Sequence, residues 1–344
     1  MKLIVDKAIP FMEGVFEPYL DVEYVESSSI IDTTVKDADA LAIRTRTRCD
    51  AALLEGSKVK IIATATIGTD HIDLDYCKRK GIYVQNAAGC NAGGVMNYVL
   101  SAIYGVASRK RVRLADTTVG IIGVGNVGSR VARALQVLGF KVLQCDPPRA
   151  AAEGPSQFCD LDHLLRNSDI VTLHVPLNST TKGMADARFF SKMKLGAFFI
   201  NAARGEVVNE KDLLNTGDKL GAIILDTWRN EPNVNPDLVA KADIATPHIA
   251  GYSYQGKLLG TSMTVRSLAR FFGIKQLYDF FPNPEGELRD AVILDPRGKS
   301  EGQIASMIQY NYPIFTDDFM FRTNVGEFEA LREQYRYRRE FFIY

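Results

Sequence analysis

The sequence predicts an α/β protein with two doubly wound parallel sheets and a small α+β domain at the carboxyl end. Three observations support this fold class. Short apolar segments alternate with helical stretches over the first 250 residues, a pattern typical of parallel strands connected by helices. A glycine-rich segment joins a strand to a helix near residue 123. The composition changes after residue 280, where Phe-Pro-Asn-Pro at 281–284 indicates a linker.

The first sheet is predicted from short apolar segments that precede the glycine-rich segment. The expected strands are 3–5, 22–25, 41–43, 60–64 and 82–84. A helical or turn-rich stretch over 70–80 ends at Gly81, and glycine commonly follows the last turn of a helix. These elements already form one doubly wound unit, so the glycine-rich segment belongs to a second domain.

The second sheet begins after a long helix expected over 91–108. Short helices are expected over 129–138, 161–166 and 210–215, and the strands are expected over 118–124, 141–146, 169–175, 197–201, 222–226 and 243–246. A helix over 252–272 returns to the first domain. We therefore expect one domain at 1–92 and 252–280, which binds the substrate, and another at 93–251, which binds the cofactor.

The carboxyl-terminal domain is expected over 281–344. It combines α and β segments, and its aromatic, charged final stretch predicts a helix over 327–342. A segment of this size buries little apolar surface alone. We expect it to form the contact between two subunits of a homodimer rather than a regulatory module.

The segment 123–128 matches G-x-G-x-x-G, the pattern of a dinucleotide-binding turn. Gly123 allows a tight turn, Gly125 lets a pyrophosphate approach the backbone, and Gly128 lets the helix pack closely on the strand. Asn126 and Val127 open the helix, whose free N–H groups favour an anion. Glycines that only form a tight βα turn in another α/β protein could match the same pattern. The strand before the motif and the helix after it favour dinucleotide binding.

An acid at the end of the next strand completes this site. Asp146 lies about 20 residues beyond the motif, at the position that accepts hydrogen bonds from the adenosine ribose. It favours NAD over NADP, because a carboxylate repels a 2′-phosphate. Arg149 carries a charge that partly offsets this repulsion, so the strictness of the preference stays open.

Three side chains at successive strand ends predict hydride-transfer chemistry on a 2-hydroxy acid. Arg204 is suited to hold the substrate carboxylate. His248 is suited to take the hydroxyl proton, and Glu231 to stabilise the imidazolium that forms. Each residue alone is more often structural. Their shared position at the carboxyl edge of one sheet indicates a catalytic set.

The other three histidines fit this role less well. We expect His163 to be solvated, because it lies in a charged stretch. His71, beside Asp70, is expected to open a helix and to cap or pack there. His174 ends a strand, and we expect it to line the cofactor site rather than to transfer protons.

Composition excludes several other classes of protein. The 344 residues include 41 basic and 41 acidic side chains, so no net charge attracts nucleic acid or a membrane surface. The five cysteines are scattered, without spacing that indicates a metal site or a disulfide framework. The sequence starts directly with a strand and has no long apolar run. We expect a cytoplasmic protein that needs no metal.

These motifs together resemble the D-isomer-specific 2-hydroxyacid dehydrogenases, and the resemblance is strong over about 40–260. The matched segments are 68–73, 81–86, 123–128, 174–177, 200–205, 225–228, 231–232 and 247–251. The resemblance implies a flavodoxin-like substrate domain and a Rossmann NAD domain. It also implies that Arg204, Glu231 and His248 are the catalytic residues.

The resemblance also assigns contacts to bound ligands. It implies that Asp226 holds the nicotinamide amide and that Val175, Ala202 and Gly251 contact NAD. Val175 stands where the family often has threonine, so a backbone contact is expected there rather than a hydroxyl contact. One branch of the family resembles the chain further, including its tail. That branch implies a phosphorylated substrate and substrate contacts at Thr45, Thr66 and Tyr252.

A phosphorylated substrate would also explain the Arg-Thr-Arg-Thr-Arg segment at 44–48. In an extended conformation the arginines share one face and form an anion site. Arg44 directly follows a predicted strand, which favours it as a ligand. Arg46 and Arg48 fit a phosphate site and a solvated edge equally well.

The expected protein is an NAD-dependent dehydrogenase of a small phosphorylated 2-hydroxy acid. Two alternatives remain open at this point. One is a related enzyme of the glycerate, phosphoglycerate or hydroxypyruvate type. The other is an NAD(H)-sensing scaffold on the same fold, although a sensor has no need of all three catalytic side chains.

Overall fold

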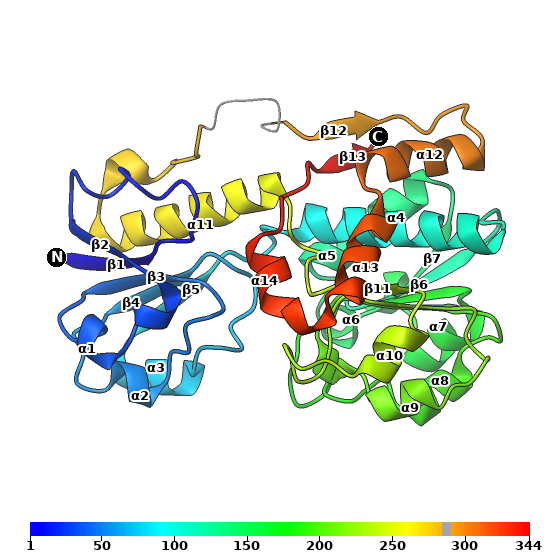
Figure 1. The fold of residues 1–344 in the computed structure, drawn as a ribbon, viewed down its shortest axis with the longest axis horizontal. Helices are drawn as coiled ribbons and strands as arrows, with labels where there is room; N and C mark the ends of the chain where they lie inside the picture. The colour runs from blue at the N-terminus through cyan, green and yellow to red at the C-terminus, as the bar shows by residue number, and fades with distance from the viewer. Residues whose placement is uncertain (284–289) are drawn as a thin grey trace. The chain divides into compact units, whose positions relative to one another are not determined.

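The computed structural model describes residues 1–283 and 290–344, which form two compact units (Figure 1). Unit 1 comprises residues 1–91 and 253–290, and unit 2 comprises 92–252 and 291–344. Each unit contains a parallel sheet with helices, which confirms the predicted α/β class. The predicted linker at 281–284 ends outside the described residues.

Unit 1 has five parallel strands in the order β2-β1-β3-β4-β5, the flavodoxin-like order. The strands are β1 (Lys2–Asp6), β2 (Asp21–Val25), β3 (Ala40–Ile43), β4 (Ile61–Thr64) and β5 (Tyr83–Asn86). Every residue of β3 and β4 is buried, because helices cover both faces of such a sheet. All five strands confirm the sequence-based expectation within two residues.

Local capping groups fix both ends of one helix of unit 1, α3 (Leu74–Lys80). The other helices of this unit are α1 (Asp32–Val35), α2 (Ala51–Leu54) and α11 (Tyr254–Phe272). Asp73 caps α3 by accepting from the Tyr76 N–H, and Gly81 ends it in the left-handed conformation, with φ +70°. His71 therefore precedes α3, and the expectation that it opens this helix was wrong.

Unit 2 has six parallel strands in the order β11-β10-β9-β8-β6-β7. The strands are β6 (Thr118–Ile122), β7 (Lys141–Cys145), β8 (Ile170–Leu173), β9 (Phe198–Asn201), β10 (Ala222–Leu225) and β11 (Ile244–Ala245). The strand β6 pairs with β7 on one side and with β8 on the other. The chain thus reverses its direction of winding at β6, and ligands of such sheets bind at the carboxyl ends of the strands there.

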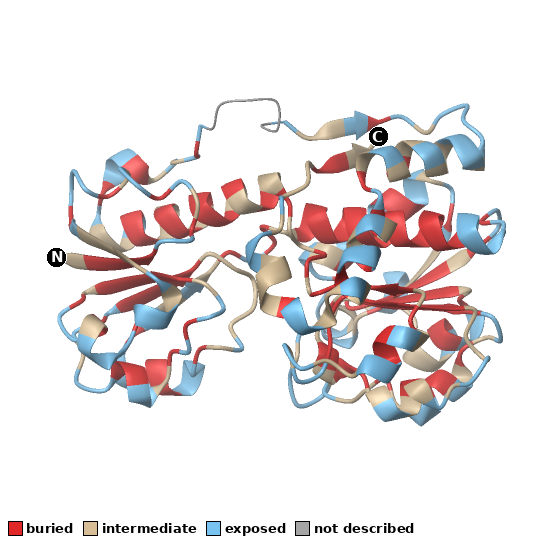
Figure 2. Ribbon diagram, in the orientation of Figure 1, coloured by how far each residue is buried: buried red, intermediate tan, exposed pale blue. Residues whose placement is uncertain are grey.

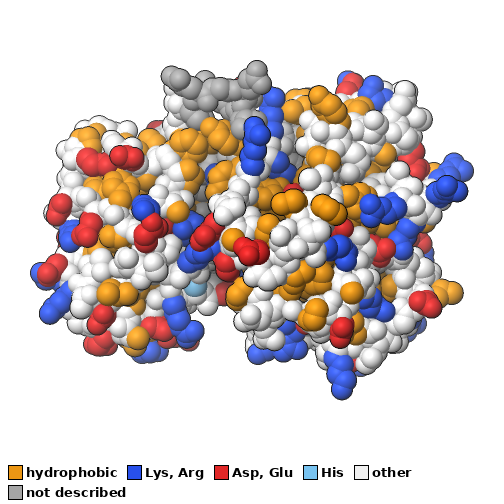
Figure 3. Space-filling view, viewed as in Figure 1, with side chains coloured by type: hydrophobic (Ala, Val, Ile, Leu, Met, Phe, Trp, Pro, Cys, Tyr) orange, Lys and Arg blue, Asp and Glu red, His pale blue; other side chains and the backbone are white. Residues whose placement is uncertain are grey.

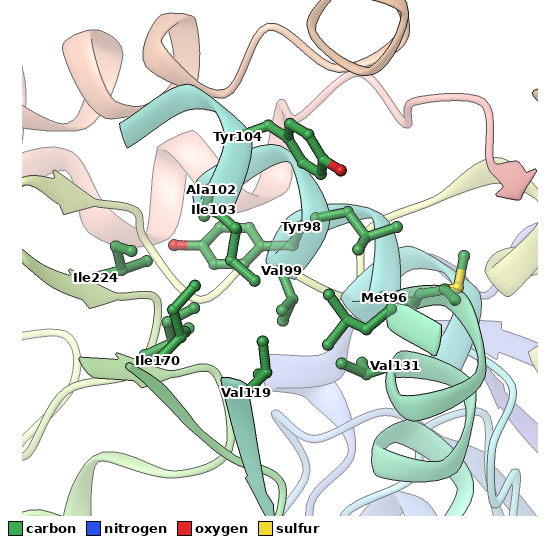
Figure 4. Packing of buried hydrophobic residues seen from close by; sticks show 14 of the residues in the cluster. Met96, Tyr98, Val99, Ala102, Ile103, Tyr104, Val119, Val131, Ile170 and Ile224 are labelled. Atoms are coloured by element: carbon green, nitrogen blue, oxygen red, sulfur yellow. The ribbon is translucent and has the colours of Figure 1, made fainter. Parts of the chain in front are cut away.

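The helix α4 (Ala92–Lys110) is the centre of the larger core of unit 2. Every residue from Ala92 to Ala107 is buried, as the continuous red ribbon in Figure 2 shows. Tyr98 and Ile103 point toward Ile170 and Ile224 of the sheet (Figure 4). A helix that is apolar all round is buried on all sides, and here the sheet, α5 (Asn126–Val137) and the tail cover it.

Short helices complete the second face of this sheet. They are α6 (Pro147–Glu153), α7 (Leu161–Asn167), α8 (Ala187–Lys192), α9 (Glu210–Leu214) and α10 (Pro236–Lys241). Asparagine or aspartate caps each of the five, starting with Asp146 before α6. The phenylalanines of α8 pack edge to face on Phe199 of β9, which forms a second apolar core.

The tail of unit 2 contains β12 (Val292–Leu294), α12 (Glu301–Asn311), α13 (Ile314–Thr323), α14 (Phe328–Glu333) and β13 (Phe341–Ile343). Buried polar contacts attach it to α4. Asn97 exchanges hydrogen bonds of 2.6 and 3.1 Å with the backbone of Phe341, and the Ser101 hydroxyl donates to the Tyr312 carbonyl at 2.5 Å. The tail is thus part of the core of unit 2.

One expectation about the tail was wrong. The predicted final helix over 327–342 is only the six-residue α14, followed by loop and by β13, which pairs in parallel with β12. Long-range pairing of Phe341 with Val292 replaces the helix there. The segment 44–48 does not meet the condition for a shared arginine face, because the Thr47 N–H donates to the Arg44 carbonyl at 3.3 Å and forms a turn in place of an extended conformation.

Basic and acidic side chains alternate on the visible face of each unit (Figure 3), in keeping with the balanced composition. Among the described residues, no helix is both long enough and apolar enough to cross a membrane.

Candidate active site

The glycine turn between β6 and α5 leaves space where a pyrophosphate would lie. Gly123 has φ +85°, and a Cβ there would lie 2.7 Å from the His174 carbonyl carbon. A Cβ on Gly128 would lie 2.0 Å from the Gly123 carbonyl oxygen. A Cβ on Gly125, by contrast, would meet no atom within 4 Å. The two outer glycines are required by packing, and the middle one borders open space.

The first turn of α5 offers unpaired donors to an anion. Its N-cap is Gly125, and no side chain caps it. Asn126 is exposed and Val127 is half-buried at this end. A twelve-residue helix with an uncapped amino end attracts a phosphate through its N–H groups and its dipole. These features fit a dinucleotide.

Asp146 lies directly beside the glycine turn. Its Oδ2 accepts from the Val124 N–H at 2.7 Å, and its Oδ1 accepts from the Arg149 N–H at 3.1 Å. Arg149 is held by Glu153, with two hydrogen bonds of 2.6 Å, and also donates to the Val124 carbonyl. The carboxylate of Asp146 is therefore fixed beside the glycine turn, and the Arg149 guanidinium is occupied by Glu153.

The end of β8 forms the opposite wall of the turn. The Val175 side chain would lie 2.8 Å from a Cβ on Gly123, so it packs on the turn. His174 Nε2 is 3.0 Å from the Thr172 hydroxyl. Burial lowers the pKa of His174 to about 3. This histidine is therefore neutral at physiological pH and unsuited to the role of a proton acceptor.

Glu231 and His248 form a direct pair. His248 Nδ1 lies 2.8 Å from Glu231 Oε2, and Glu231 Oε1 accepts from the Trp228 N–H at 2.9 Å. Burial acts to raise the pKa of Glu231, but the charge and hydrogen bond of His248 and the Trp228 N–H outweigh it, so that this pKa is lowered. An ionised Glu231 is an acceptor only, which assigns the Nδ1 proton to His248 and leaves Nε2 as a base.

Arg204 follows β9 at the neighbouring strand end. Its turn is held by Asn201, whose side chain accepts from the Ala203 N–H and donates to the Arg204 carbonyl. Ala202 in this turn is half-buried. A Cβ on Gly205 would lie 1.9 Å from the Trp228 carbonyl carbon. The backbone after Arg204 thus contacts the loop that carries Glu231.

The carboxylate of Asp226, which directly follows β10, holds the loop that carries His248. This carboxylate accepts from the Thr246 hydroxyl at 2.7 Å, from the Ile249 N–H at 2.8 Å and from the Ala250 N–H at 2.9 Å. Burial raises the pKa of Asp226, although these donors oppose the shift. Thr246 also bonds to the buried Tyr98 hydroxyl at 2.8 Å. Gly251, half-buried, follows this loop.

Sequence reasoning missed two arginines of the tail. Arg332 lies beside Tyr252, with its guanidinium carbon 5.9 Å from the ring centre, and its charge helps to lower the pKa of Glu231. Arg338 donates to the carbonyl oxygens of Ile249 and Ala250. No motif marks these residues, because only the folded tail brings them to the loop.

Three predicted substrate contacts lie in unit 1. Arg44 forms a bidentate pair with the buried carboxylate of Asp6, at 2.9 and 3.2 Å. Thr45 is exposed, and the Thr66 hydroxyl is 2.7 Å from that of Thr64 at the end of β4. The Arg44 guanidinium thus has a structural partner, which the sequence did not indicate.

The structure also shows the surroundings of Arg48, His163 and His71. Arg48 is largely exposed and pairs with Asp50 at 2.7 Å, as expected for a solvated edge. His163 is exposed, and the His71 carbonyl accepts from the Cys49 N–H. Within residues 1–283 and 290–344, no group of three or more His, Cys, Asp or Glu side chains is arranged to hold a metal ion.

Comparison with known proteins identifies the relatives of this chain. Residues 102–250 match the family "D-isomer specific 2-hydroxyacid dehydrogenase, NAD binding domain". Erythronate-4-phosphate dehydrogenase of Bacteroides fragilis is 41% identical over 99% of this chain and 97% of its own length. The enzyme of that name from Yersinia enterocolitica is 40% identical over 99% of this chain and 93% of its own.

Solved structures agree with this result. NAD⁺-bound 3-phosphoglycerate dehydrogenase of Entamoeba histolytica has a TM-score of 0.67 and 27% identity, and covers 83% of this chain and 99% of its own. D-lactate dehydrogenase of Aquifex aeolicus, solved with NAD and lactic acid, has a TM-score of 0.61 and 26% identity over 83% and 100%. The two curated relatives, in contrast, also align with the tail. The chain therefore belongs to the erythronate-4-phosphate dehydrogenases, a branch of the NAD-binding D-isomer-specific 2-hydroxyacid dehydrogenase family.

Proposed function

We propose that this protein oxidises 4-phospho-D-erythronate at C2, with NAD as the acceptor, to (R)-3-hydroxy-2-oxo-4-phosphooxybutanoate in pyridoxal 5′-phosphate synthesis. Similarity over nearly the full length to erythronate-4-phosphate dehydrogenases supports the substrate. The observation that carries the chemistry is the 2.8 Å hydrogen bond between Glu231 and His248. It supplies an oriented base at the same carboxyl edge of the sheet as the glycine turn.

The three strand-end residues have separate roles in this proposal. Arg204 binds the substrate carboxylate as a fixed cation. His248 Nε2 takes the proton of the C2 hydroxyl as that carbon loses a hydride. Glu231 accepts from Nδ1, keeps the imidazole in one tautomer and stabilises the imidazolium. In the reverse direction, protonated His248 returns its proton to the carbonyl oxygen.

The cofactor site follows from the glycine turn. Gly125 and the backbone of Asn126 and Val127 would hold the pyrophosphate, in a turn that Gly123 and Gly128 shape through close packing. Asp146 would accept from the ribose hydroxyls. The nicotinamide ring of bound NAD⁺ supplies the hydride acceptor. Other cofactor contacts are assigned by family resemblance at Val175, Ala202, Asp226 and Gly251.

The substrate phosphate requires further donors. Family resemblance assigns substrate contacts to Thr45 and Thr66 of unit 1 and to Tyr252 of unit 2. Arg44 stays a predicted ligand, although its pair with Asp6 uses part of its donor capacity. We include these residues as proposed contacts of a dianionic group, for which hydroxyl and guanidinium donors are suited.

We also propose a homodimer formed through the tail. Of 15 exposed large apolar side chains among the described residues, 5 lie between Ile293 and Tyr344. Concentrated exposed apolar side chains are typical of protein contact surfaces. The cytoplasmic location stays a prediction of the sequence.

The test is to follow reduced nicotinamide while the purified protein oxidises 4-phospho-D-erythronate. Unphosphorylated erythronate and 3-phosphoglycerate serve as comparison substrates, and a 2-oxo acid is added as a possible re-oxidant. We expect a strong preference for the phosphorylated four-carbon acid. Equal turnover of another acid would keep the dehydrogenase and reject the substrate. Tight NADH binding without turnover of any acid would instead favour a sensor.

A further inference from the structure

The loop that carries His248 has an unfavourable backbone conformation. His248 has φ +57°, a region that side chains other than glycine occupy at a cost. Such a conformation persists only where the surroundings fix it. The Ile249 and Ala250 N–H groups, which follow directly, are held by the Asp226 carboxylate at 2.8 and 2.9 Å. The Asp226 carboxylate thus accounts for the N–H groups of these two residues.

Arg338 of the tail holds the carbonyl groups of the same two residues. Its Nη1 donates to the Ile249 carbonyl at 3.1 Å, and its Nη2 donates to the Ala250 carbonyl and, at 3.3 Å, to that of Gly94 in α4. One guanidinium therefore bonds to the same two residues as the Asp226 carboxylate. The planar fork of arginine suits this task, because it presents several donors in a fixed geometry.

The guanidinium is itself held in place. Its carbon lies 4.0 Å from the centre of the Tyr312 ring, close enough for a cation–π contact. Its Nη1 also donates to the Tyr335 hydroxyl at 2.9 Å, and that hydroxyl donates to Asp317 at 2.8 Å. The tail therefore supplies both the cation and the groups that orient it.

We propose that Arg338 is a positioning residue for His248: with Asp226 it clamps the backbone of Ile249 and Ala250, directly after His248, and thereby fixes the imidazole against Glu231. This inference rests on the proposed function for its kinetic consequence. Removing the guanidinium takes this donor from the Ala250 carbonyl and leaves the Ile249 carbonyl with the Tyr252 N–H alone, and it releases the strained loop. A displacement of about 1 Å at a reacting group costs about 10²-fold in rate.

Arg322 provides a matched control in the same tail. It also bonds to two backbone carbonyls of unit 2, those of Val239 and Ala242, and to the Asp318 carboxylate. Those carbonyls belong to the end of α10, not to the loop of His248. Arg322→Met therefore reports the loss of stability that follows from removing a tail arginine, without loss of the clamp.

The experiment compares Arg338→Met, Arg338→Lys and Arg322→Met in the full-length protein. We measure kcat and KM for 4-phospho-D-erythronate, the thermal midpoint, and the downfield proton resonance of the His248 Nδ1–H in ¹⁵N-histidine-labelled protein. We expect Arg338→Met to lower kcat by about 10²-fold, with a smaller change in KM, and to lose the resonance. Arg338→Lys, whose ammonium offers its donors from a single nitrogen, recovers part of kcat. Arg322→Met keeps both kcat and the resonance.

Two results would overturn the proposal. One is a kcat and a resonance in Arg338→Met that match those of Arg322→Met. The other, decisive if Arg338→Met does not fold, is a kcat of Arg338→Lys equal to that of the parent protein. The resonance needs no substrate, so it tests the clamp even if the parent protein does not oxidise this acid, an outcome that rejects the proposed function alone.

Discussion

At the scale of single residues, the pKa values of the half-buried ionisable groups of unit 2 shift in opposite directions. The pKa of Glu231 is lowered because His248 and a backbone N–H outweigh burial. The pKa of Glu210 is raised because burial outweighs its hydrogen bond from the Arg229 N–H. The pKa of His174 is lowered to about 3 by burial alone. Among these groups, the Glu231–His248 pair combines an ionised acceptor with an oriented imidazole, as general-base chemistry requires.

The Glu231–His248 pair predicts a pH-dependent stability. A carboxyl group whose folded pKa lies below its ordinary 4.5 adds stability that is present above that value and is lost as pH falls through the folded pKa. Glu231→Gln should therefore lower the free energy of unfolding most near pH 7. The difference in this free energy between the variant and the parent protein should shrink below pH 4.5. Urea unfolding at pH 7, 5 and 4 measures this. Glu210→Gln should show the opposite trend, and parallel trends for the two variants would contradict the assignment.

The proposed catalytic roles predict that two substitutions change different kinetic constants. His248→Gln removes the base and should lower kcat by about 10²–10⁴-fold. Arg204→Ala removes the carboxylate partner and should mainly raise KM for the hydroxy acid. Steady-state kinetics measures both effects, and NADH fluorescence titration checks that the cofactor site is intact. Retained activity in both variants would contradict the roles given to these side chains.

At the scale of elements, the glycine turn separates packing from ligand binding. Gly128→Ala places a Cβ 2.0 Å from the Gly123 carbonyl oxygen, so α5 must shift, and we expect a loss of about 1–3 kcal/mol in stability. Gly125→Ala meets no protein atom within 4 Å. It should leave the thermal midpoint almost unchanged and weaken NADH binding. Calorimetry and titration test this contrast, and normal NADH affinity in Gly125→Ala would show that the pyrophosphate lies elsewhere.

Much of the fold could be predicted from the sequence because buried strands and the residues at their ends follow recognisable patterns. Strands such as β6 and β10 are buried on both faces, so their apolar runs are visible without tertiary information. Strand-end residues such as Glu231 and His248 share an edge because parallel strands align their carboxyl ends. Arg44 was harder to interpret, because its bond to Asp6 joins two distant parts of the sequence.

The tail was predicted least well, for a related reason. Its final stretch has helical composition, but Arg338 donates to the loop after His248 and Phe341 pairs with Val292. These long-range contacts outweigh local helix propensity, which is worth less than 1 kcal/mol per residue. A pattern of neighbouring residues carries no information about such partners. For the same reason, the sequence did not indicate that Arg332 and Arg338 lie beside the candidate site.

At the scale of the whole molecule, the tail has an inner and an outer face. Its inner side chains, including Ile308, Ile314 and Phe341, are fully buried in unit 2. Asp318 covers the edge strand β11 by accepting from the Ala245 N–H at 2.7 Å, which blocks further strand pairing there. Its outer side chains include Tyr310 and Phe319, which are 88% and 65% exposed. Changes on the outer face should therefore leave the fold of unit 2 intact.

This difference between the two faces allows the proposed homodimer to be tested without unfolding the protein. The double variant Tyr310→Glu, Phe319→Glu adds two charges to the outer face, where a partner subunit would have to bury them, and unpaired buried charge is costly. We expect at least a tenfold weaker dimer, equivalent to about 1.4 kcal/mol, with an unchanged circular dichroism spectrum. Sedimentation velocity over a concentration series measures the dissociation constant. Tyr83→Glu, which alters an exposed side chain of unit 1 (63% exposed), is the control. A dimer equally strong in both variants would mean that the subunits meet through another surface.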